Sequence, residues 1–156
     1  MKKINFLNKL LKEKKIEIVE PSEEIKKSCL KKSESSLESA KILLENDKFE
    51  ESIALSYYSM YHMLTALFFK AGIKCENHLA SIILLKELFN INNADILSAK
   101  TERIDKQYYV DFNITVREVM ASIKMAESFN NNLLDFISRL NNDKIKYYRE
   151  RLNTLM

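Results

Sequence analysis

The stretch that decides the fold is Ser52–Phe69, which reads SIALSYYSMYHMLTALFF. These 18 residues contain no formally charged side chain, and this length is the lower limit for a helix that spans a membrane. Eight of them carry a hydroxyl or an imidazole. Lipid would leave many of these polar groups without hydrogen-bond partners, whereas neighbouring helices can supply partners. The stretch therefore predicts the central, enclosed helix of a helical bundle and no membrane span.

The composition of the whole chain favours the same fold class. Gly72 and Pro21 are the only glycine and proline among 156 residues, which excludes β-sandwiches, barrels, Rossmann sheets and phosphate loops, since all of these need glycine turns. With 46% hydrophobic and 30% charged residues, an all-α domain remains. Two cysteines are too few for a disulfide framework, and the N-terminal residues lack the cleavage site of a secretion signal. We therefore expect a cytoplasmic protein.

Start and stop signals divide the chain into helices. Ser22 is a natural N-cap, Gly72 is suited to the left-handed position after a helix, and Thr115 with Glu118 forms a capping box. The asparagines at 130–132 interrupt the last apolar stripe and suggest a bend there. The four main helices are expected at 22–45, 49–71, about 79–89 and about 115–140, with a weaker helical segment at 94–106 and loops at 73–78 and 108–113.

These elements predict an up-and-down antiparallel helical bundle of four main helices. A short amphipathic arm at 3–12 and an extended segment at 12–20 precede the bundle, and a helical tail follows it. We expect a single domain over residues 1–156, with a core at about 22–140, a basic N-terminal arm at 1–20 and a basic C-terminal tail at 141–156.

The charge of the chain is concentrated at its two ends. The net charge is +3, and residues 1–20 alone hold six lysines against three glutamates, whereas residues 141–156 hold four basic against two acidic side chains. Basic ends can follow phosphates or an acidic partner. They can equally serve solubility.

The densest polar cluster lies on the predicted central helix. Tyr58 and His62 are four residues apart and share one face, with Tyr61 beside them. As a functional site, His62 would be a general base or phosphate ligand among hydroxyl donors. As structure, the tyrosines would fill the core or a dimer seam, with their hydroxyls bonded to neighbours. The residues alone leave both interpretations open.

Two other groups of residues are candidates for chemistry. Cys75 and His78 have the spacing of half a zinc site, but no second pair completes it, so we expect no metal and no cofactor, and we expect His78 to cap the next helix or line a cleft. Near the end of the weak helix, Arg103 is suited to hold a phosphate and Tyr108 to stack on a base. An exposed ion pair with aromatic packing under a loop explains the same residues equally well.

Several runs of the sequence resemble the HEPN-domain family of small archaeal and bacterial proteins. The resemblance covers about residues 22–137. Its most specific part is the Tyr-Tyr-x-Met-Tyr-His segment at 57–62. Weaker helical patterns extend it, namely Ser33-x-x-Ser36-Leu37-x-x-Ala40-Lys41, Leu67-Phe68 to Gly72, and Ala99-Lys100-x-x-Arg103-x-Asp105-x-x-Tyr108-Tyr109.

The resemblance implies a helical bundle that forms a homodimer, and many such proteins are encoded beside a minimal nucleotidyltransferase as toxin–antitoxin pairs. Active members are metal-independent ribonucleases with an Arg followed roughly four to six residues later by a His. Arg103 matches this Arg, and Tyr108 stands where the His belongs. With the resemblance, the catalytic candidates are Arg103, Tyr108 and His62. The binding candidates are Tyr58, Tyr61, His78, Asp105 and Tyr109.

Two functions of different class follow. In the first, a HEPN-type dimer acts with a nucleotidyltransferase, binds RNA or a nucleotide, and cleaves RNA without a metal ion. In the second, the chain is a non-catalytic helical adaptor whose tyrosine-rich face binds a partner protein.

Overall fold

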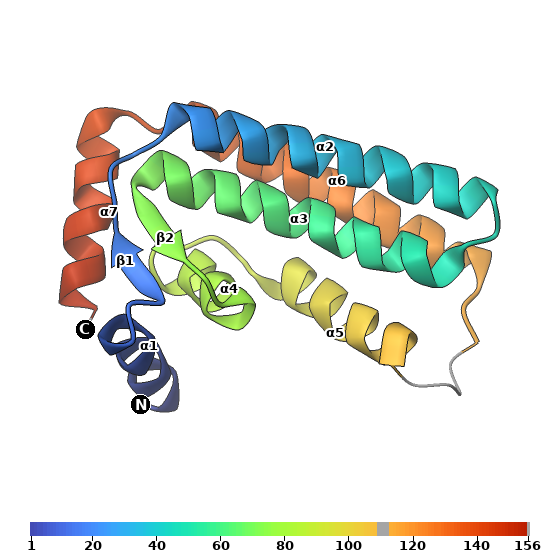
Figure 1. Cartoon of the computed structure of the whole chain (residues 1–156), viewed down its shortest axis with the longest axis horizontal. Helices are drawn as coiled ribbons and strands as arrows, with labels where there is room; N and C mark the ends of the chain where they lie inside the picture. Colours follow the sequence, from blue (N-terminus) through green and yellow to red (C-terminus); the bar gives the residue numbers. More distant parts are fainter. Residues whose placement is uncertain (109–112, 156) are drawn as a thin grey trace.

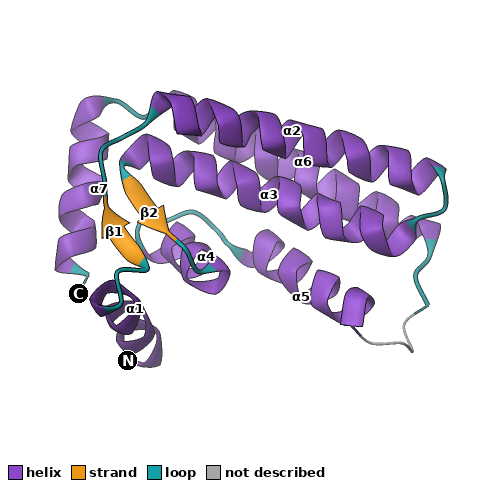
Figure 2. Ribbon diagram, viewed as in Figure 1, coloured by secondary structure: helices purple, strands orange, loops and turns teal. Residues whose placement is uncertain are grey.

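The computed structural model describes residues 1–108 and 113–155, and this part of the chain forms an all-α bundle with one small two-stranded sheet (Figures 1 and 2). The predicted fold class is therefore confirmed. The helices are α1 (Lys2–Lys12), α2 (Glu23–Glu45), α3 (Phe49–Ala71), α4 (His78–Glu87), α5 (Ala94–Tyr108), α6 (Val116–Ser138) and α7 (Asn142–Thr154), and the strands are β1 (Ile16–Ile18) and β2 (Ile73–Cys75).

Helices α2 and α3 form the long antiparallel hairpin on which the rest of the fold is built (Figure 1). The Ser22 hydroxyl caps α2 by accepting a hydrogen bond from the Ile25 amide at 3.1 Å, as the sequence predicted. Asp47 makes the turn between the helices in a left-handed conformation, with φ at 57°. Both helices match their predicted bounds to within one residue.

Small polar residues allow α2 and α3 to pack closely. Ser33 and Ser59 form two reciprocal hydrogen bonds. Each hydroxyl donates to the other residue's carbonyl oxygen at 2.7 Å. The Ser52 hydroxyl donates to the Ala40 carbonyl at 2.6 Å. These hydroxyls are buried, and their bonds to backbone carbonyls offset the cost of removing them from water.

Helix α3 is the enclosed helix that the uncharged stretch predicted. The side chains of Tyr57, Met60, Leu64 and Leu67 are all 0% exposed. Helices α2, α5 and α6 pack around it. None of the described helices is long and apolar enough to cross a membrane.

Helix α6 begins at the predicted capping box. The Glu118 amide donates to the Thr115 hydroxyl at 3.2 Å, and the Thr115 amide donates to the Glu118 carboxylate at 2.8 Å. The helix expected at about 115–140 is observed as Val116–Ser138 and continues through the asparagines at 130–132. Asn130 is buried, and its Nδ2 donates to the Ser59 hydroxyl at 2.8 Å, so its polar side chain is accommodated inside the bundle.

The segment expected as a loop at 73–78 contains a strand, which corrects the sequence prediction. Ile73–Cys75 pairs antiparallel with Ile16–Ile18, which lies within the segment predicted to be extended. Gly72 joins α3 to this strand with φ at 71°, a left-handed conformation that glycine adopts without steric cost. Strand β2 connects the end of α3 to the start of α4, and β1 connects α1 to α2 (Figure 2).

The two basic ends of the chain are packed onto the bundle. Helix α1 buries Leu7 and Leu10, and helix α7 buries Ile145 and Leu152. In α7 the guanidinium of Arg149 donates to the Val19 carbonyl at 2.8 Å, and that of Arg151 donates to the Glu87 carbonyl at 3.1 Å. Half of the basic side chains of the tail therefore hold backbone carbonyls in place.

Candidate functional site

The chemistry-bearing side chains gather where α3, α4 and α5 meet. Helix α3 contributes Tyr57, Tyr58 and Tyr61, the first turn of α4 contributes His78, and α5 contributes Arg103. These five residues are called the Arg103 cluster below. Tyr57 is fully buried, whereas the other four members are half-buried, so the cluster lies at the edge of the core.

His78 is held at the centre of the cluster by two tyrosines. The Tyr57 hydroxyl lies 2.9 Å from His78 Nδ1, in hydrogen-bonding distance. The ring of Tyr61 stacks on the imidazole, with the ring centres 3.7 Å apart and the planes 15° from parallel. The Asn77 side chain caps α4 one residue earlier by accepting from the Ala80 amide at 2.9 Å, so it is Asn77, and not His78, that caps this helix.

Arg103 contacts Tyr57, which also bonds to His78, and the neighbouring Tyr58. Its Nη1 donates to the Tyr58 hydroxyl at 3.2 Å. Its guanidinium carbon is 5.2 Å from the centre of the Tyr57 ring and 5.4 Å from the centre of the Tyr58 ring, which is within the range of a cation–π interaction. The Tyr57 ring thus contacts both the guanidinium and the imidazole.

The electrostatics of the cluster favour a neutral imidazole. Burial lowers the pKa of His78, and the nearby positive charges of Arg103 and Lys100 lower it further. Burial also raises the pKa of the Tyr57 phenol and that of Tyr61, so both phenols remain protonated at neutral pH. The cluster therefore combines a fixed cation, phenolic donors and an unprotonated imidazole, a set of groups suited to bind an anion and to accept a proton.

The structure brings together four of the residues predicted for the site, namely Tyr58, Tyr61, His78 and Arg103. His62 lies on α3 one residue beyond Tyr61, where burial and then the charge of Lys32 on α2 lower its pKa. It is also close enough to contribute to the lowered pKa of His78.

The remaining predicted residues lie outside the cluster or outside the described part of the chain. Tyr108 is the last described residue of α5, and its side chain is 65% exposed. Asp105 lies two residues after Arg103, on another face of the helix, where it lines an open depression with Glu102 and Lys106. Tyr109 falls outside the described residues.

The sequence interpretation missed Tyr57 and Lys100 as members of this environment. Tyr57 belongs to the polar run on the central helix but was not among the predicted site residues; it is fully buried, and its hydroxyl reaches the site. The signal was its position four residues before Tyr61, which places both rings on one face. Lys100 precedes Arg103 by three residues, which likewise places both charges on one face of α5.

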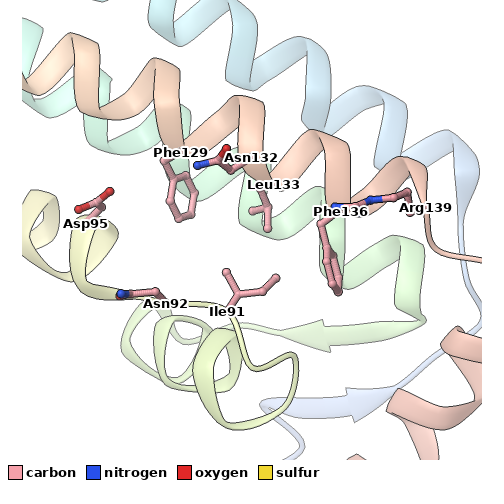
Figure 3. Close-up of a pocket in the computed structure, with 8 residues that line it drawn as sticks. All are labelled: Ile91, Asn92, Asp95, Phe129, Asn132, Leu133, Phe136 and Arg139. Atoms are coloured by element: carbon pink, nitrogen blue, oxygen red, sulfur yellow. The ribbon is translucent and has the colours of Figure 1, made fainter.

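A second candidate is a cavity of about 290 Å³ between α6 and the segment that joins α4 to α5 (Figure 3). Phe129, Leu133 and Phe136 supply its apolar wall, and Asp95 and Arg139 lie toward its opposite ends. The guanidinium of Arg139 is already paired with the carboxylate of Asp135, the residue one turn earlier on α6. Because an adjacent carboxylate neutralises its cation, this cavity is a weaker candidate than the Arg103 cluster for binding an anion.

Cys75 and His78 have the spacing of half a zinc site, but the Cys75 thiol is in a form unsuited to a metal. The Cys75 thiol lies 3.5 Å from the Asn77 carbonyl, and burial raises its pKa, which disfavours the thiolate that a metal would need. Within residues 1–108 and 113–155, no group of three or more His, Cys, Asp or Glu side chains is placed to hold a metal ion.

Comparison with known proteins identifies the family. The HEPN domain matches residues 26–136, which is most of the chain. The chain belongs to the HEPN domain family. A UPF0332 protein of the archaeon Pyrococcus horikoshii is 36% identical over 101 residues, which cover 65% of this chain and 66% of that protein. The chain thus spans just under two thirds of the length of this relative.

The Arg103 cluster lies entirely within the residues that match the HEPN domain, 26–136. Arg103 is followed five positions later by Tyr108. The two histidines of this HEPN chain are His62 and His78.

Proposed function

We propose that this HEPN protein binds RNA at the Arg103 cluster and cleaves it without a metal ion. The observation that carries the proposal is the position of Arg103, whose guanidinium lies at a half-buried surface over two tyrosine rings, one of which also bonds to the His78 imidazole. Guanidinium groups bind phosphate through fixed, forked donors, and aromatic side chains stack on unpaired bases. The two kinds of group at one place fit a single-stranded RNA better than they fit an apolar ligand.

The proposed reaction uses the substrate's own hydroxyl. The ribose 2′-oxygen attacks the adjacent phosphorus, a bond between them forms, and the bond from phosphorus to the 5′-oxygen breaks. Negative charge develops on the phosphoryl oxygens during this step. Arg103 would stabilise that charge, because a positioned cation in a partly buried site interacts more strongly than it would in water.

The proposal includes two protein partners that the family resemblance implies. The first is a second copy of this chain, which would face the half-buried side of the Arg103 cluster and enclose the RNA between two such clusters. The second is a minimal nucleotidyltransferase, as in toxin–antitoxin pairs. Light scattering of the purified protein tests the first, and co-purification with a nucleotidyltransferase encoded in an adjacent reading frame tests the second.

The direct test is incubation of the purified protein with mixed RNA in the presence of EDTA. Arg103→Ala should lower cleavage by about 10²–10³-fold, the usual effect of removing one group that stabilises transition-state charge. Arg117→Ala is the matched control, because it removes the same charge from an exposed position on α6. Equal cleavage by Arg103→Ala and wild type would refute the proposed role of Arg103.

A non-catalytic adaptor is the second candidate function, and one surface favours it. A groove of about 510 Å³ lies between α2 and α6, where Leu44, Met120 and Ile123 present apolar surface and Met120 is 57% exposed. An ion pair between Lys41 and Glu127 at 2.7 Å borders the groove. If the purified protein neither binds nor cleaves RNA, and Met120→Glu abolishes binding to a co-purified partner, the adaptor is the correct function.

A further inference from the structure

His78 occupies a place in the structure that the family's sequence pattern does not assign. The pattern puts a histidine shortly after the arginine on the same helix, and this chain has Tyr108 there, with a largely exposed side chain. A histidine nevertheless reaches the surroundings of Arg103 from another element, the first turn of α4. We propose that His78 is the catalytic base of the ribonuclease reaction and that Tyr57 is its positioning residue. This inference rests on the proposed function.

The first argument is that the imidazole is held in one orientation. The hydrogen bond of 2.9 Å to the Tyr57 hydroxyl uses Nδ1. The parallel stack of Tyr61, with ring centres 3.7 Å apart, restricts rotation of the ring out of its plane. Proton transfer with a substrate would therefore fall to Nε2, the nitrogen on the far side of the ring from Nδ1.

The second argument is that the Tyr57 hydroxyl suits both protonation states of this imidazole. A phenol can accept as well as donate a hydrogen bond. When Nε2 is an unprotonated base, Nδ1 carries the hydrogen and donates it to the Tyr57 oxygen. When Nε2 has taken up a proton, Nδ1 still donates to the same oxygen. Tyr57 is fully buried, so its oxygen is a fixed acceptor throughout the reaction.

The charges that face His78 favour its neutral form. Arg103 and Lys100 on α5 and His62 on α3 all act to lower its pKa, and burial has the largest effect. The positive end of α4, where His78 is the first residue, disfavours the imidazolium further. At neutral pH His78 is therefore neutral, which is the state that a general base requires.

The Tyr57 ring lies next to both the proposed base, His78, and the cation, Arg103. The Tyr57 ring has the imidazole as one neighbour, with centres 6.1 Å apart, and the Arg103 guanidinium as another, at 5.2 Å. A phosphodiester bound by Arg103 would thus have its ribose within the neighbourhood of His78. Tyr108 lacks this placement, and a phenol with a pKa near 10 is a poor base at neutral pH.

The proposed step balances in atoms and charge. The proton of the ribose 2′-hydroxyl moves to Nε2 of His78, the 2′-oxygen forms its bond to phosphorus, and the 5′-oxygen leaves. The 5′-oxygen takes a proton from water, and His78 returns its proton to the hydroxide that remains. The products are a 2′,3′-cyclic phosphate on one fragment and a 5′-hydroxyl on the other, with no oxidant, reductant or cofactor consumed.

The test compares single-turnover RNA cleavage by wild type, His78→Asn and Tyr57→Phe. Asparagine retains an amide that can bond to Tyr57 but cannot accept a proton, so cleavage should fall by about 10²–10⁴-fold while RNA binding is kept. Tyr57→Phe should slow cleavage by about tenfold, the equivalent of one ordinary hydrogen bond. Tyr148→Phe is the matched control, since Tyr148 is a half-buried tyrosine on α7, outside the cluster.

The pH profile separates a base from a merely structural residue. Wild-type cleavage should rise with pH, with the midpoint of the rise below the ordinary histidine pKa of 6.5, because the pKa of His78 is lowered. Tyr57→Phe should move this rise along the pH axis, since it removes the acceptor for Nδ1–H. A profile that Tyr57→Phe leaves unmoved, with a rate equal to wild type, would overturn the positioning role.

The outcomes distinguish this inference from the proposed function. Cleavage by wild type together with full cleavage by His78→Asn refutes His78 as the base and leaves the ribonuclease proposal standing. If wild type cleaves no RNA, both fail. If His78→Asn does not fold, NMR of the wild-type histidines decides, with an RNA oligonucleotide that has a 2′-deoxy ribose at the cleavage position as the probe. The chain has only two histidines, and His62→Gln assigns their signals. A shift of the His78 signals on binding supports the inference, and unchanged signals overturn it.

Discussion

Replacing Gly72 by alanine should destabilise the protein more than any exposed substitution, although it adds only one methyl group. Gly72 has φ at 71°, and a left-handed conformation costs a residue with a side chain about 1–2 kcal/mol. A Cβ atom there would also stand 2.6 Å from the Val19 carbonyl oxygen and would collide with the guanidinium of Arg149. Both neighbours have to move.

The movement breaks contacts that the structure uses. The Val19 amide donates to the Gly72 carbonyl at 2.9 Å, and Arg149 donates to the Val19 carbonyl at 2.8 Å. Each such hydrogen bond contributes about 1 kcal/mol. Together with the backbone strain, the expected loss is about 3–4 kcal/mol in the free energy of unfolding.

Urea unfolding followed by far-UV circular dichroism measures this loss. With a typical urea dependence for a small protein, the midpoint should fall by about 1–2 M. Lys14→Gly is the opposite control, because Lys14 already has φ at 55° and glycine there relieves strain, which gives a change of about 0 to 1 kcal/mol in favour of folding. A loss below about 1 kcal/mol for Gly72→Ala would show that the close approach to Val19 is not the constraint we describe.

Further predictions concern the buried hydroxyls and the acid limit of stability. Ser59→Ala should cost about 1–3 kcal/mol, because it leaves the buried Asn130 amide without its acceptor. Ser56→Ala, one turn earlier on α3, should be neutral or stabilising in the same urea assay, because the buried Ser56 hydroxyl has no hydrogen-bond partner among the described residues. Equal losses of stability for Ser59→Ala and Ser56→Ala would contradict this account. Hydrogen bonds from Lys26 and Lys70 lower the pKa of Glu23 to about 2, so its contribution to stability is present above pH 4.5 and is lost as the pH falls toward 2. Glu23→Gln should therefore be less stable than wild type at neutral pH, by less than about 1 kcal/mol because the side chain is exposed. Near pH 2 the two proteins should be equally stable. A difference in stability that does not change with pH would contradict this prediction.

The sequence was sufficient for those parts of the fold that local chemistry determines. Ser22, Gly72 and the Thr115–Glu118 capping box act through bonds to residues within one helical turn, and each was found where it was predicted. The central helix was also predictable, because an uncharged stretch with eight polar groups requires partners from other helices.

The sequence was insufficient where the partner is distant along the chain. The strand Ile73–Cys75 pairs with Ile16–Ile18, and nothing within a local window announces that pairing. Asn130 was taken as an interruption because an amide within an apolar stripe has no local partner, and its partner Ser59 lies 71 residues earlier.

The candidate site shows the same division. Helical spacing predicted that Tyr58 and His62 share a polar face with Tyr61 beside them, and the resemblance selected Arg103. Neither could show that His78 bonds to Tyr57 from another helix. His62 was named as a catalytic candidate because it lies four residues after Tyr58 and shares its face. Whether a side chain on α3 meets α5 or α2 depends on how the helices pack, and no local pattern contains that information.

The reciprocal bonds between Ser33 and Ser59 have a mechanical consequence. A slip of α3 past α2 by one helical turn would displace it by about 5.4 Å and would break both bonds at once, together with the bond from Ser52 to Ala40. Tyr57 and Tyr58 immediately precede Ser59 on the same rigid rod, so their axial position is set by those serines. These hydroxyls therefore fix the position of the aromatic rings along the helix axis. Substitutions that remove the hydroxyls should misplace the His78 imidazole even where the bundle still folds.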